Sequence, residues 1–496
     1  MKPESKNLKT QLTLSFAAAA MLAEYKGPDL PIRSVTADSR KVLPGDLFVA
    51  IPGAKVDGHE FIRDVEEKGA IAVVASQPIE TKLPVLLVSN TVEALGLFAK
   101  AYRALFNIPK AALTGSCGKT TVKEMIASIL DLQGPVLANI GNLNTEVGLP
   151  LTLLRLDPSH QTAVIEMGAR KPGDITYLMS LVEPDITLIT NAGVAHVEIF
   201  GSEDGIAKAK GEIFEHLSST GTAIINYDDI HADYWLSLLN KGQRIFCFGL
   251  NSLEKETLSK KNINQHIFAE DIQLNPNHSE FELCIARNTN ANSNSNSNAN
   301  ANANANANAN ANKNNESIHI NFKAPGLHNI HNALAAAAVA LAFNIPLAMI
   351  KAGLERFNPV DGRLQFKSAI KGAKLIDDTY NANPISVRAA LSVLAKHPGK
   401  KIFVMGDMFE LGENASSMHR AMGEEAKRLG IHQLLGIGSL TESAVEAFGS
   451  GASHYPDKSS LIQTLRETLG PDVAVLIKGS RGMRMEEVVS PLMTEK

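Results

Sequence analysis

The fold class that the sequence predicts is α/β, with three domains built largely on parallel sheets. The chain has 496 residues, and at roughly 150 residues per domain this length indicates about three domains. From about residue 107 onward, short apolar runs that end in Gly, Asn or Asp alternate with segments of helical periodicity. This rhythm is typical of βα units around parallel strands. One such strand and helix also flank a small-residue loop of the kind that binds phosphate.

The first part of the chain predicts a small α/β domain over residues 1–106. The apolar run 12–23 follows several lysines, as in a secretory signal, but Glu24 and Lys26 stand where a small-residue cleavage site would be. We therefore expect this run to be a helix of the mature protein. The turn at 44–46 and the alternating segments around it fit short strands. No stretch approaches the ~20 apolar residues needed to span a bilayer.

Two series of strands follow, and they predict two further domains. The first series lies in 107–357 and predicts a central domain with a P-loop ATPase-like parallel sheet. The second lies in 358–496 and predicts a C-terminal Rossmann-like domain. The alanine-rich segment 332–341 predicts a helix between them, and 357–362, with its Pro and Gly, predicts a hinge. The expected strands are 111–114, 163–166, 186–190, 223–226, 375–378, 402–405, 434–437 and 473–477.

The segment 288–315 differs from the rest of the chain because Asn alternates with Ala or Ser almost throughout. Such a composition buries too little apolar surface to offset the entropy of ordering, so we expect disorder. The flanking segments 281–286 and 318–322 are strand-like, which makes the tract an expanded hairpin loop. An assembly role for the Asn-rich tract is the alternative.

Composition limits the class of partner. Charged residues make up 20% of the chain and the net charge is -4, so no global feature indicates a nucleic-acid or membrane surface. We expect small-molecule partners. The cysteines Cys117, Cys247 and Cys284 are odd in number and far apart, which argues for a reducing, cytoplasmic location.

The clearest chemical motif is LTGSCGKTT at 113–121, between a short apolar strand and the helical segment VKEMIASIL. Small residues let the backbone N–H groups approach phosphate oxygens, and the helix dipole favours the same anion. Lys119 would neutralise the β and γ phosphates, and the Thr120 hydroxyl would bind Mg²⁺. A full P-loop has glycine where Leu113 stands, so the match is to a shortened form. The ATP-binding residues predicted here are Thr114, Gly115, Ser116, Cys117, Gly118, Lys119, Thr120 and Thr121. One face of the following helix should be buried, namely Val122, Met125, Ile126, Ile129 and Leu130.

Several ordered blocks of sequence resemble the Mur ligase family, over nearly the whole chain except the Asn-rich tract. The blocks are TADSRKVLPGDLFVA, DGHEF, GSCGKTTVKEM, GNLNTEVGLPLTLL, IEMGA, AHVEIFGS, AKAKGEIF, PGLHNIHNALAAAAVA, GRL, DDTYNANP, MGDMFELG and LIKGSRGMRMEEV. The resemblance implies a monomeric, cytoplasmic, ATP- and Mg²⁺-dependent ligase of cell-wall precursor synthesis. It implies UDP-N-acetylmuramoyl tripeptide and D-alanyl-D-alanine as substrates, joined through an acyl phosphate.

The resemblance also implies metal-binding and catalytic roles in the central domain. Glu166 follows an apolar strand where a parallel sheet opens its ligand crevice, and a carboxylate there suits Mg²⁺. His196 is a second implied metal ligand or a group that orients the site. Lys210 is implied to react with CO₂ and to hold a second Mg²⁺ as a carbamate, with Lys208 as the competing position. From the residues alone, each of these side chains is equally consistent with a structural or solvated role.

Further implied residues serve the nucleotide. Asn329 and Asn332 would belong to the nucleotide site, although His328 and these asparagines also fit a helix cap. Arg363 would contact phosphate and Asp378 the ribose. Because these last two follow the predicted hinge, their role implies domain closure during turnover.

The remaining implied residues bind the other two substrates. For the amine they are Tyr380, Asn381 and Asn383, and an Asn- and Pro-rich turn is the alternative reading of this segment. For the nucleotide-sugar peptide they are Asp38, Ser39, Arg40, Asp57, His59, Asn142, Asn144 and Thr145.

Three other functions are the alternatives to this one. A sister ligase that adds the third-position diamino acid should carry a DNPR-like segment, which does not occur in the sequence. A folate polyglutamylating ligase would leave the N-terminal TADSR block without a role. An ATP-switched binding protein would use the same phosphate loop without catalysing ligation, and it would hydrolyse ATP without needing the substrates.

Overall fold

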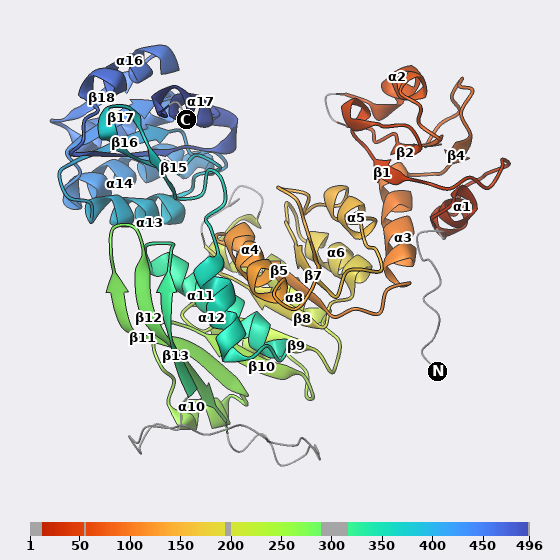
Figure 1. Ribbon diagram of the computed structural model, residues 1–496, viewed down its shortest axis with the longest axis horizontal. Coiled ribbons are helices and arrows are strands. Elements are labelled where there is room, and N and C mark those ends of the chain that lie inside the picture. The colour runs from red at the N-terminus through yellow and green to blue at the C-terminus, as the bar shows by residue number, and fades with distance from the viewer. Residues whose placement is uncertain (1–11, 54–55, 194–199, 289–315, 495–496) are drawn as a thin grey trace.

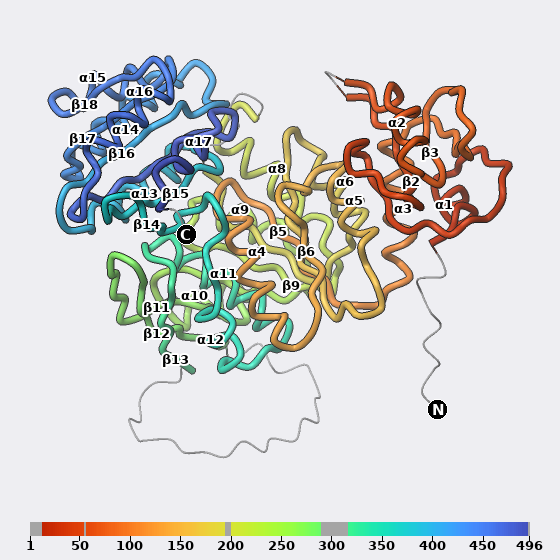
Figure 2. Tube along the Cα trace, turned by 45° about the horizontal axis from the view of Figure 1, so that its top comes forward, coloured from red at the N-terminus to blue at the C-terminus, as the bar shows by residue number. Residues whose placement is uncertain are grey.

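The computed structural model describes residues 12–53, 56–193, 200–288 and 316–494, and this part of the chain forms sheets of four, nine and six strands in sequence order. The nine-stranded sheet lies in the middle, with the other two on either side of it (Figure 1). The same arrangement is visible after rotation (Figure 2), where the N-terminal and C-terminal sheets stand well apart. The α/β class with a parallel-rich central sheet is confirmed.

The first sheet is fully parallel in the order β1-β2-β3-β4. The apolar run near the N-terminus does form a helix, α1, with Thr13 as its N-cap. Helix α3 is capped by the Asn90 side chain and leads directly to the central sheet. The elements are α1 (Leu14–Met21), β1 (Ser34–Thr36), β2 (Asp46–Val49), α2 (Ile62–Glu67), β3 (Ala72–Ala75), β4 (Val85–Leu87) and α3 (Thr91–Arg103).

The central sheet has the order β13-β12-β11-β10-β9-β8-β5-β7-β6, parallel from β6 to β11 and antiparallel at β12 and β13. The four strands expected at 111–114, 163–166, 186–190 and 223–226 are all present, with ends shifted by one residue at most, and the strand-like segments 281–286 and 318–322 begin two residues earlier than expected. The strands are β5 (Lys110–Thr114), β6 (Val136–Ala138), β7 (Thr162–Glu166), β8 (Ile186–Ile189), β9 (Thr222–Asn226), β10 (Arg244–Phe248), β11 (Gln265–Leu274), β12 (Ser279–Arg287) and β13 (Glu316–Phe322).

Helices cover both faces of this sheet, because alternate residues of each strand point to opposite sides. Helices α4, α11 and α12 share one apolar core, and α5, α6, α8 and α9 share the core on the other face. The predicted apolar side of α4 is entirely buried. The helices are α4 (Lys119–Leu130), α5 (Gly148–Leu153), α6 (Asp174–Val182), α8 (Glu203–Glu215), α9 (Ala232–Ser237), α10 (Lys255–Lys260), α11 (Leu327–Ala342) and α12 (Leu347–Arg356).

The third sheet has the order β14-β15-β19-β16-β17-β18, with only the β14–β15 pair antiparallel. The chain reaches it through residues 357–364, which form neither helix nor strand, as expected of the predicted hinge. The elements are β14 (Gln365–Ser368), β15 (Lys374–Asp378), α13 (Pro384–Ala395), β16 (Lys400–Gly406), α14 (Ala415–Arg428), β17 (Gln433–Ile437), α15 (Glu442–Phe448), β18 (Ala452–Tyr455), α16 (Lys458–Thr468), β19 (Val473–Lys478) and α17 (Glu486–Val489).

The two outer sheets are joined to the central one in different ways. Helix α3 packs into the same apolar core as α5 and α6, the Tyr102 hydroxyl donates to the Leu156 carbonyl at 2.9 Å, and Arg103 donates to the Leu181 carbonyl at 3.1 Å. The third sheet has its own two cores, separate from those of the central sheet. The N-terminal sheet is therefore fixed to the central one by a continuous core.

The Asn-rich tract lies between two strands that pair with each other. Strands β12 and β13 are antiparallel, with Ile285 opposite Glu316, so the hairpin prediction for the flanking segments is confirmed. Residues 289–315 of the tract themselves lie outside the described residues. Among the helices that the structure describes, none combines the length and the apolar character that crossing a lipid bilayer requires.

Candidate active site

A cleft of about 490 Å³ lies between the central and third sheets. It opens at the carboxyl end of β5, where the phosphate loop begins, and its other wall comes from the segments that follow β15. Parallel sheets bind ligands at this edge. Of the residues predicted from the sequence, it is lined by Ser116, Cys117, Gly118, Lys119, Thr120, Thr121, Asn144, Glu166, Asn329, Asn332, Arg363, Asp378, Tyr380, Asn381 and Asn383.

The phosphate loop, residues 114–121, is held in place by hydrogen bonds to the segment that follows β8. The Cys117 N–H donates to Asn191 Oδ1 at 2.9 Å, and the Cys117 carbonyl accepts from Thr190 Oγ1 at 2.6 Å. Gly118 has φ +80°, and a Cβ there would lie 2.6 Å from Asn332 Oδ1. Only glycine suits this position, because a side chain would be strained and would meet Asn332.

Lys119 begins helix α4 and folds its ammonium group over the loop. Its Nζ donates to the Gly115 carbonyl at 2.6 Å and lies 3.4 Å from the Ser116 carbonyl. Burial lowers the pKa of Lys119, partly opposed by the negative charge of Glu166. The cation therefore lies inside the loop that would surround the phosphates of a nucleotide.

The Thr120 hydroxyl is bonded to Glu166 on one side and to Arg363 on the other. Glu166 Oε2 accepts from Thr120 Oγ1 at 2.8 Å, and Glu166 Oε1 accepts from Asn144 Nδ2 at 2.7 Å. Across the cleft, Arg363 Nη2 donates to the same Thr120 hydroxyl at 2.9 Å. Both Glu166 and Thr120 are buried. Residues from three separate segments thus converge on one hydroxyl.

The Thr120 and Glu166 oxygens fit a magnesium ion. Hydroxyl and carboxylate oxygens are hard ligands, and Mg²⁺ commonly takes only one or two protein ligands, with phosphate and water completing its shell. No group of three or more His, Cys, Asp and Glu side chains within the described ranges is arranged to hold a metal. A two-oxygen site beside a phosphate loop does not need such a group.

A second cavity, of about 380 Å³, adjoins the first. Lys119 and Asn144 line both cavities, so the two meet at the phosphate loop. Lys210, on helix α8, is 5% exposed and lines the second cavity. Burial, together with the positive charge of Lys119, lowers the pKa of Lys210 to about 7. The predicted residues that line this cavity are Gly115, Lys119, Asn142, Asn144, Thr145 and Lys210.

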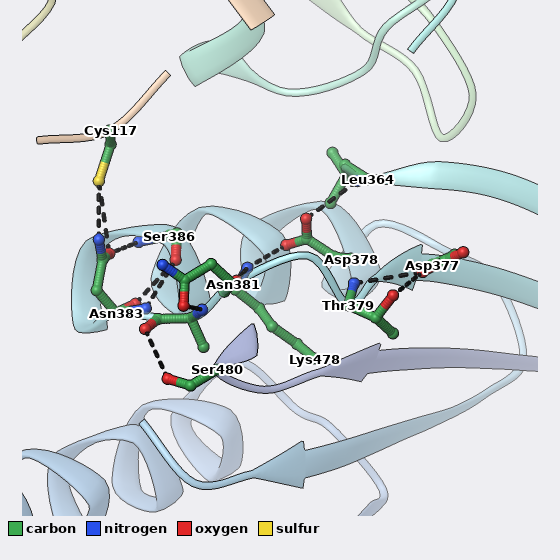
Figure 3. A network of polar contacts seen from close by, with 11 residues as sticks. Cys117, Leu364, Asp377, Asp378, Thr379, Asn381, Asn383, Ser386, Lys478 and Ser480 are labelled. Carbon is green, nitrogen blue, oxygen red and sulfur yellow. Dashed lines mark hydrogen bonds and ion pairs between the residues drawn. The ribbon is translucent and has the colours of Figure 1, made fainter. Parts of the chain in front are cut away.

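The third sheet presents a polar network to the cleft (Figure 3). The Asp378 carboxylate pairs with Lys478 Nζ at 2.6 Å and accepts the Leu364 N–H at 3.0 Å. Asn383 caps helix α13 in a capping box, and its Nδ2 reaches Cys117 Sγ at 3.1 Å. The phosphate loop and the third sheet are therefore in direct contact.

Helix α11 points its first turn at the same cleft. It begins at Leu327, five residues before the segment predicted as helical, so His328, Asn329 and Asn332 lie in its first two turns. Asn329 Nδ2 donates to the Pro325 carbonyl at 2.9 Å. Burial lowers the pKa of His328 to about 4, so the imidazole is neutral at pH 7.

Comparison with known proteins agrees with this arrangement. Three family models match the chain: "Mur ligase family, catalytic domain" over 31–103, "Mur ligase middle domain" over 113–340 and "Mur ligase, glutamate ligase domain" over 362–481. The UDP-N-acetylmuramoyl-tripeptide--D-alanyl-D-alanine ligase of Escherichia coli (strain K12) is 38% identical over 97% of this chain and 98% of its own length. The chain belongs to the Mur ligase family.

Solved structures of Mur ligases are also similar to this chain over most of its length. The crystal structure of MurF from Acinetobacter baumannii is 32% identical and matches with a TM-score of 0.83, covering 97% of this chain and 99% of that chain. The crystal structure of MurF ligase from Thermotoga maritima in complex with ADP is 26% identical, with a TM-score of 0.74 over 92% of this chain and 96% of that chain. The resemblance stated from the sequence blocks is thereby confirmed.

Some predicted residues of this Mur ligase lie elsewhere. Thr114 ends strand β5 and is buried, and it lines neither cavity. His196 lies outside the described residues. Five predicted residues of the N-terminal sheet line neither cavity, namely Asp38, Ser39, Arg40, Asp57 and His59.

The N-terminal residues form two local pairs of their own. A hydrogen bond from Arg40 to Asp38, at 2.8 Å, lowers the pKa of Asp38 to about 2. His59 Nδ1 lies 2.7 Å from Asp57 Oδ1, and His59 Nε2 accepts the Ser76 N–H at 3.1 Å. Asp38 and Asp57 are the N-caps of two short 3-10 helices, so each pair is held together locally.

Sequence reasoning missed several residues that position the site. Asn139 Oδ1 accepts the Glu166 N–H at 2.7 Å, while its carbonyl accepts from the buried Lys123 at 2.6 Å. Lys478, which pairs with Asp378, lies in the block LIKGSRGMRMEEV, but nothing in the sequence indicated its role. The available signal was position: Asn139 and Lys478 stand at the carboxyl ends of β6 and β19, where site residues gather.

Proposed function

We propose that this Mur ligase adds D-alanyl-D-alanine to UDP-N-acetylmuramoyl tripeptide, using ATP to form an acyl phosphate, in the synthesis of peptidoglycan precursors. The observation that carries the proposal is the meeting of two cavities at Lys119 and Asn144. One cavity contains the phosphate loop and the other borders Lys210. A phosphoryl donor and an acid acceptor can therefore approach each other within one site.

The relatives support this choice of substrates over the alternatives. The matching Escherichia coli protein is named for the tripeptide and the dipeptide, and a matching MurF structure was solved with ADP. The match to the Escherichia coli protein covers 97% of this chain, so it includes the N-terminal sheet. We assign residues 1–106 to the UDP-substrate, 107–357 to ATP and 358–496 to ligation.

The first step is transfer of the γ-phosphoryl group to the terminal carboxylate of the tripeptide. This reaction needs positioning and charge neutralisation more than covalent help. Lys119 supplies a cation inside the loop, and Arg363 supplies another from across the cleft. The Nε of Arg363 is buried without a hydrogen-bond partner among the described residues, which leaves a donor available for phosphate.

Magnesium, held by Thr120 and Glu166, would neutralise charge on the phosphates. His196 and a carbamate on Lys210 are the further ligands proposed. Asn144 keeps the Glu166 carboxylate oriented through its hydrogen bond of 2.7 Å. The role of the chain in this step is thus to fix the oxygens in place before the nucleotide arrives.

In the second step the amine of the dipeptide attacks the acyl carbon. A carbon–nitrogen bond forms, the amine loses a proton, and the tetrahedral intermediate releases inorganic phosphate. Tyr380, Asn381 and Asn383 are the residues proposed for the amine, on the wall opposite the phosphate loop. Asn383 contacts Cys117 of the phosphate loop, so the docked third sheet brings this wall to the phosphoryl site.

The other substrate-binding assignments follow the same logic. Asn329 and Asn332 would serve the nucleotide, with Asp378 at its ribose. The polar turns of the first sheet would hold the uridine diphosphate, and the second cavity the sugar-peptide end. The residues for these two parts are Asp38, Ser39, Arg40, Asp57, His59, Asn142, Asn144 and Thr145.

The test is a release assay with purified protein. Phosphate and pentapeptide product should appear only when ATP, UDP-tripeptide and D-alanyl-D-alanine are all present. ATP hydrolysis that is independent of both substrates would instead support a nucleotide switch. Product from UDP-dipeptide and a free diamino acid would identify the sister ligase. Parallel reactions with diaminopimelate- and lysine-containing tripeptides would define the third residue.

A further inference from the structure

The loop that follows β19, residues 479–485, brings the Arg481 guanidinium group close to the ring of Tyr380, although Arg481 itself is in the lining of neither cavity. Arg481 Cζ lies 5.8 Å from the centre of the Tyr380 ring, and Tyr380 lines the cleft. Arg363 Cζ lies 4.1 Å from the centre of the same ring and also contacts Thr120. One aromatic ring therefore links the phosphate side of the site to Arg481.

The loop is anchored on both sides by Ser480, which is buried. The Ser480 N–H donates to the Asp407 carbonyl at 2.9 Å, and its hydroxyl accepts the Phe409 N–H at 2.8 Å. The hydroxyl also lies 3.4 Å from the Ala382 carbonyl, the contact drawn in Figure 3. The loops that follow β15 and β16 thus hold Ser480, and this fixes the point in the chain from which Arg481 extends.

Of the cations Arg363, Lys478 and Arg481, Arg481 has the most exposed ion pair. Arg363 is bound to Thr120, and Lys478 is bound to Asp378 and to the Asn381 carbonyl, at 2.6 and 2.8 Å. The acidic partner of Arg481 is Glu486, at 3.2 Å, and their side chains are 63% and 38% exposed. An exposed ion pair of this kind contributes little and can exchange for another carboxylate.

We propose that Arg481 binds the C-terminal carboxylate of the incoming dipeptide and so selects a dipeptide as the amine substrate. This inference rests on the proposed function. A guanidinium group binds a carboxylate through two parallel hydrogen bonds. With that end held at the rim, the amine is directed toward the acyl phosphate. A single amino acid carries its carboxylate one residue closer to its amine, so it cannot satisfy both ends.

The experiment compares D-alanyl-D-alanine with its C-terminal amide, at saturating ATP and UDP-tripeptide. The variants are Arg481→Met, Arg481→Lys and the control Arg484→Met. Arg484 lies in the same loop, is 69% exposed, and pairs with Glu487 at 2.7 Å. The wild type should show a KM for the amide about 10- to 100-fold above that for the dipeptide, the loss expected for one charge-assisted contact.

Arg481→Met should raise the KM for the dipeptide by a similar factor with little change in kcat, and it should no longer distinguish acid from amide. Arg481→Lys should recover part of the discrimination, and Arg484→Met should behave as the wild type. The proposal would be overturned if the ratio of the KM for the amide to the KM for the dipeptide were the same in Arg481→Met as in the wild type. It would also be overturned if Arg484→Met changed this ratio as much as Arg481→Met does.

Two further measurements separate this proposal from the proposed function. Acyl phosphate formed without dipeptide and trapped with hydroxylamine should be equal in wild type and Arg481→Met, which also shows that the variant is folded. A wild type that makes no pentapeptide would reject the proposed function itself. A wild type that makes pentapeptide, beside an Arg481→Met variant with unchanged discrimination, would reject only the role of Arg481.

Discussion

Lys210 should react with CO₂ in a pH-dependent way, because its pKa is about 7. Only the neutral amine attacks CO₂, forming a nitrogen–carbon bond and losing a proton. Since the pKa of this cation is lowered, the neutral form predominates above pH 7 and is lost below it. About nine-tenths of the amine is neutral at pH 8 and about one-tenth at pH 6, whereas a solvated lysine with a pKa of about 10.4 is only about 0.4% neutral at pH 8. Burial therefore increases the reactive fraction roughly 200-fold at pH 8.

The assay is ¹³C NMR of the protein equilibrated with ¹³CO₂ at a fixed partial pressure. One carbamate signal should grow at least about tenfold between pH 6 and pH 8, the change in neutral amine alone. Lys210→Arg should abolish the signal. Lys208→Ala is the matched control, since Lys208 lies on the same helix but is exposed, and it should leave the signal intact. A signal that survives in Lys210→Arg, or that disappears in Lys208→Ala, would refute this reasoning.

Three other substitutions test separate parts of the molecule. Lys119→Ala should reduce ATP-dependent ligation by about 10³-fold or more in a coupled ADP-release assay, with little change in thermal stability because its Nζ bonds only to carbonyls of its own loop; near-normal turnover would contradict the role of this cation. Lys478→Met leaves the Asp378 carboxylate without its ion-pair partner and should destabilise the third sheet by about 3–5 kcal/mol. Faster amide hydrogen exchange in the third sheet would report this loss. Adding Asp378→Asn should recover part of the lost stability. Replacing residues 288–315 by a short turn should leave turnover within about twofold, because β12 and β13 already pair on their own, and a large loss of turnover would show that the tract has a function.

The strands that were predicted, and the phosphate loop, could be found because their signals are local, whereas β6, β10 and β11 were not predicted individually. Apolar runs of four or five residues marked β5 and β7, and their ends were placed within one residue. The buried face of α4 followed from its periodicity. Helix α11 was predicted too short at its start, because His328 and Asn329 read as a cap, whereas the helix already begins at Leu327.

Contacts between distant segments could not be predicted in the same way. The bonds from Asn139 to Glu166 and from Lys478 to Asp378 depend on which strands lie side by side, and that order is set by packing of the whole sheet. Strand β19, the last of its sheet in the sequence, is inserted between β15 and β16. The sequence blocks identified the residues near the site, but the pairing partners needed the topology.

The difference between the two junctions of the central sheet determines how the substrates meet the protein. The N-terminal sheet and the central sheet share one apolar core through α3, so the surface proposed for the sugar-peptide acid should be complete before anything binds. The third sheet has cores of its own and is linked through residues 357–364. The wall proposed for the dipeptide, formed by Tyr380, Asn381 and Asn383, should by contrast face the phosphate loop only while the third sheet is docked against it, as the contact of Asn383 with Cys117 shows it here. Binding should consequently be ordered, with the acid and nucleotide first and the dipeptide last.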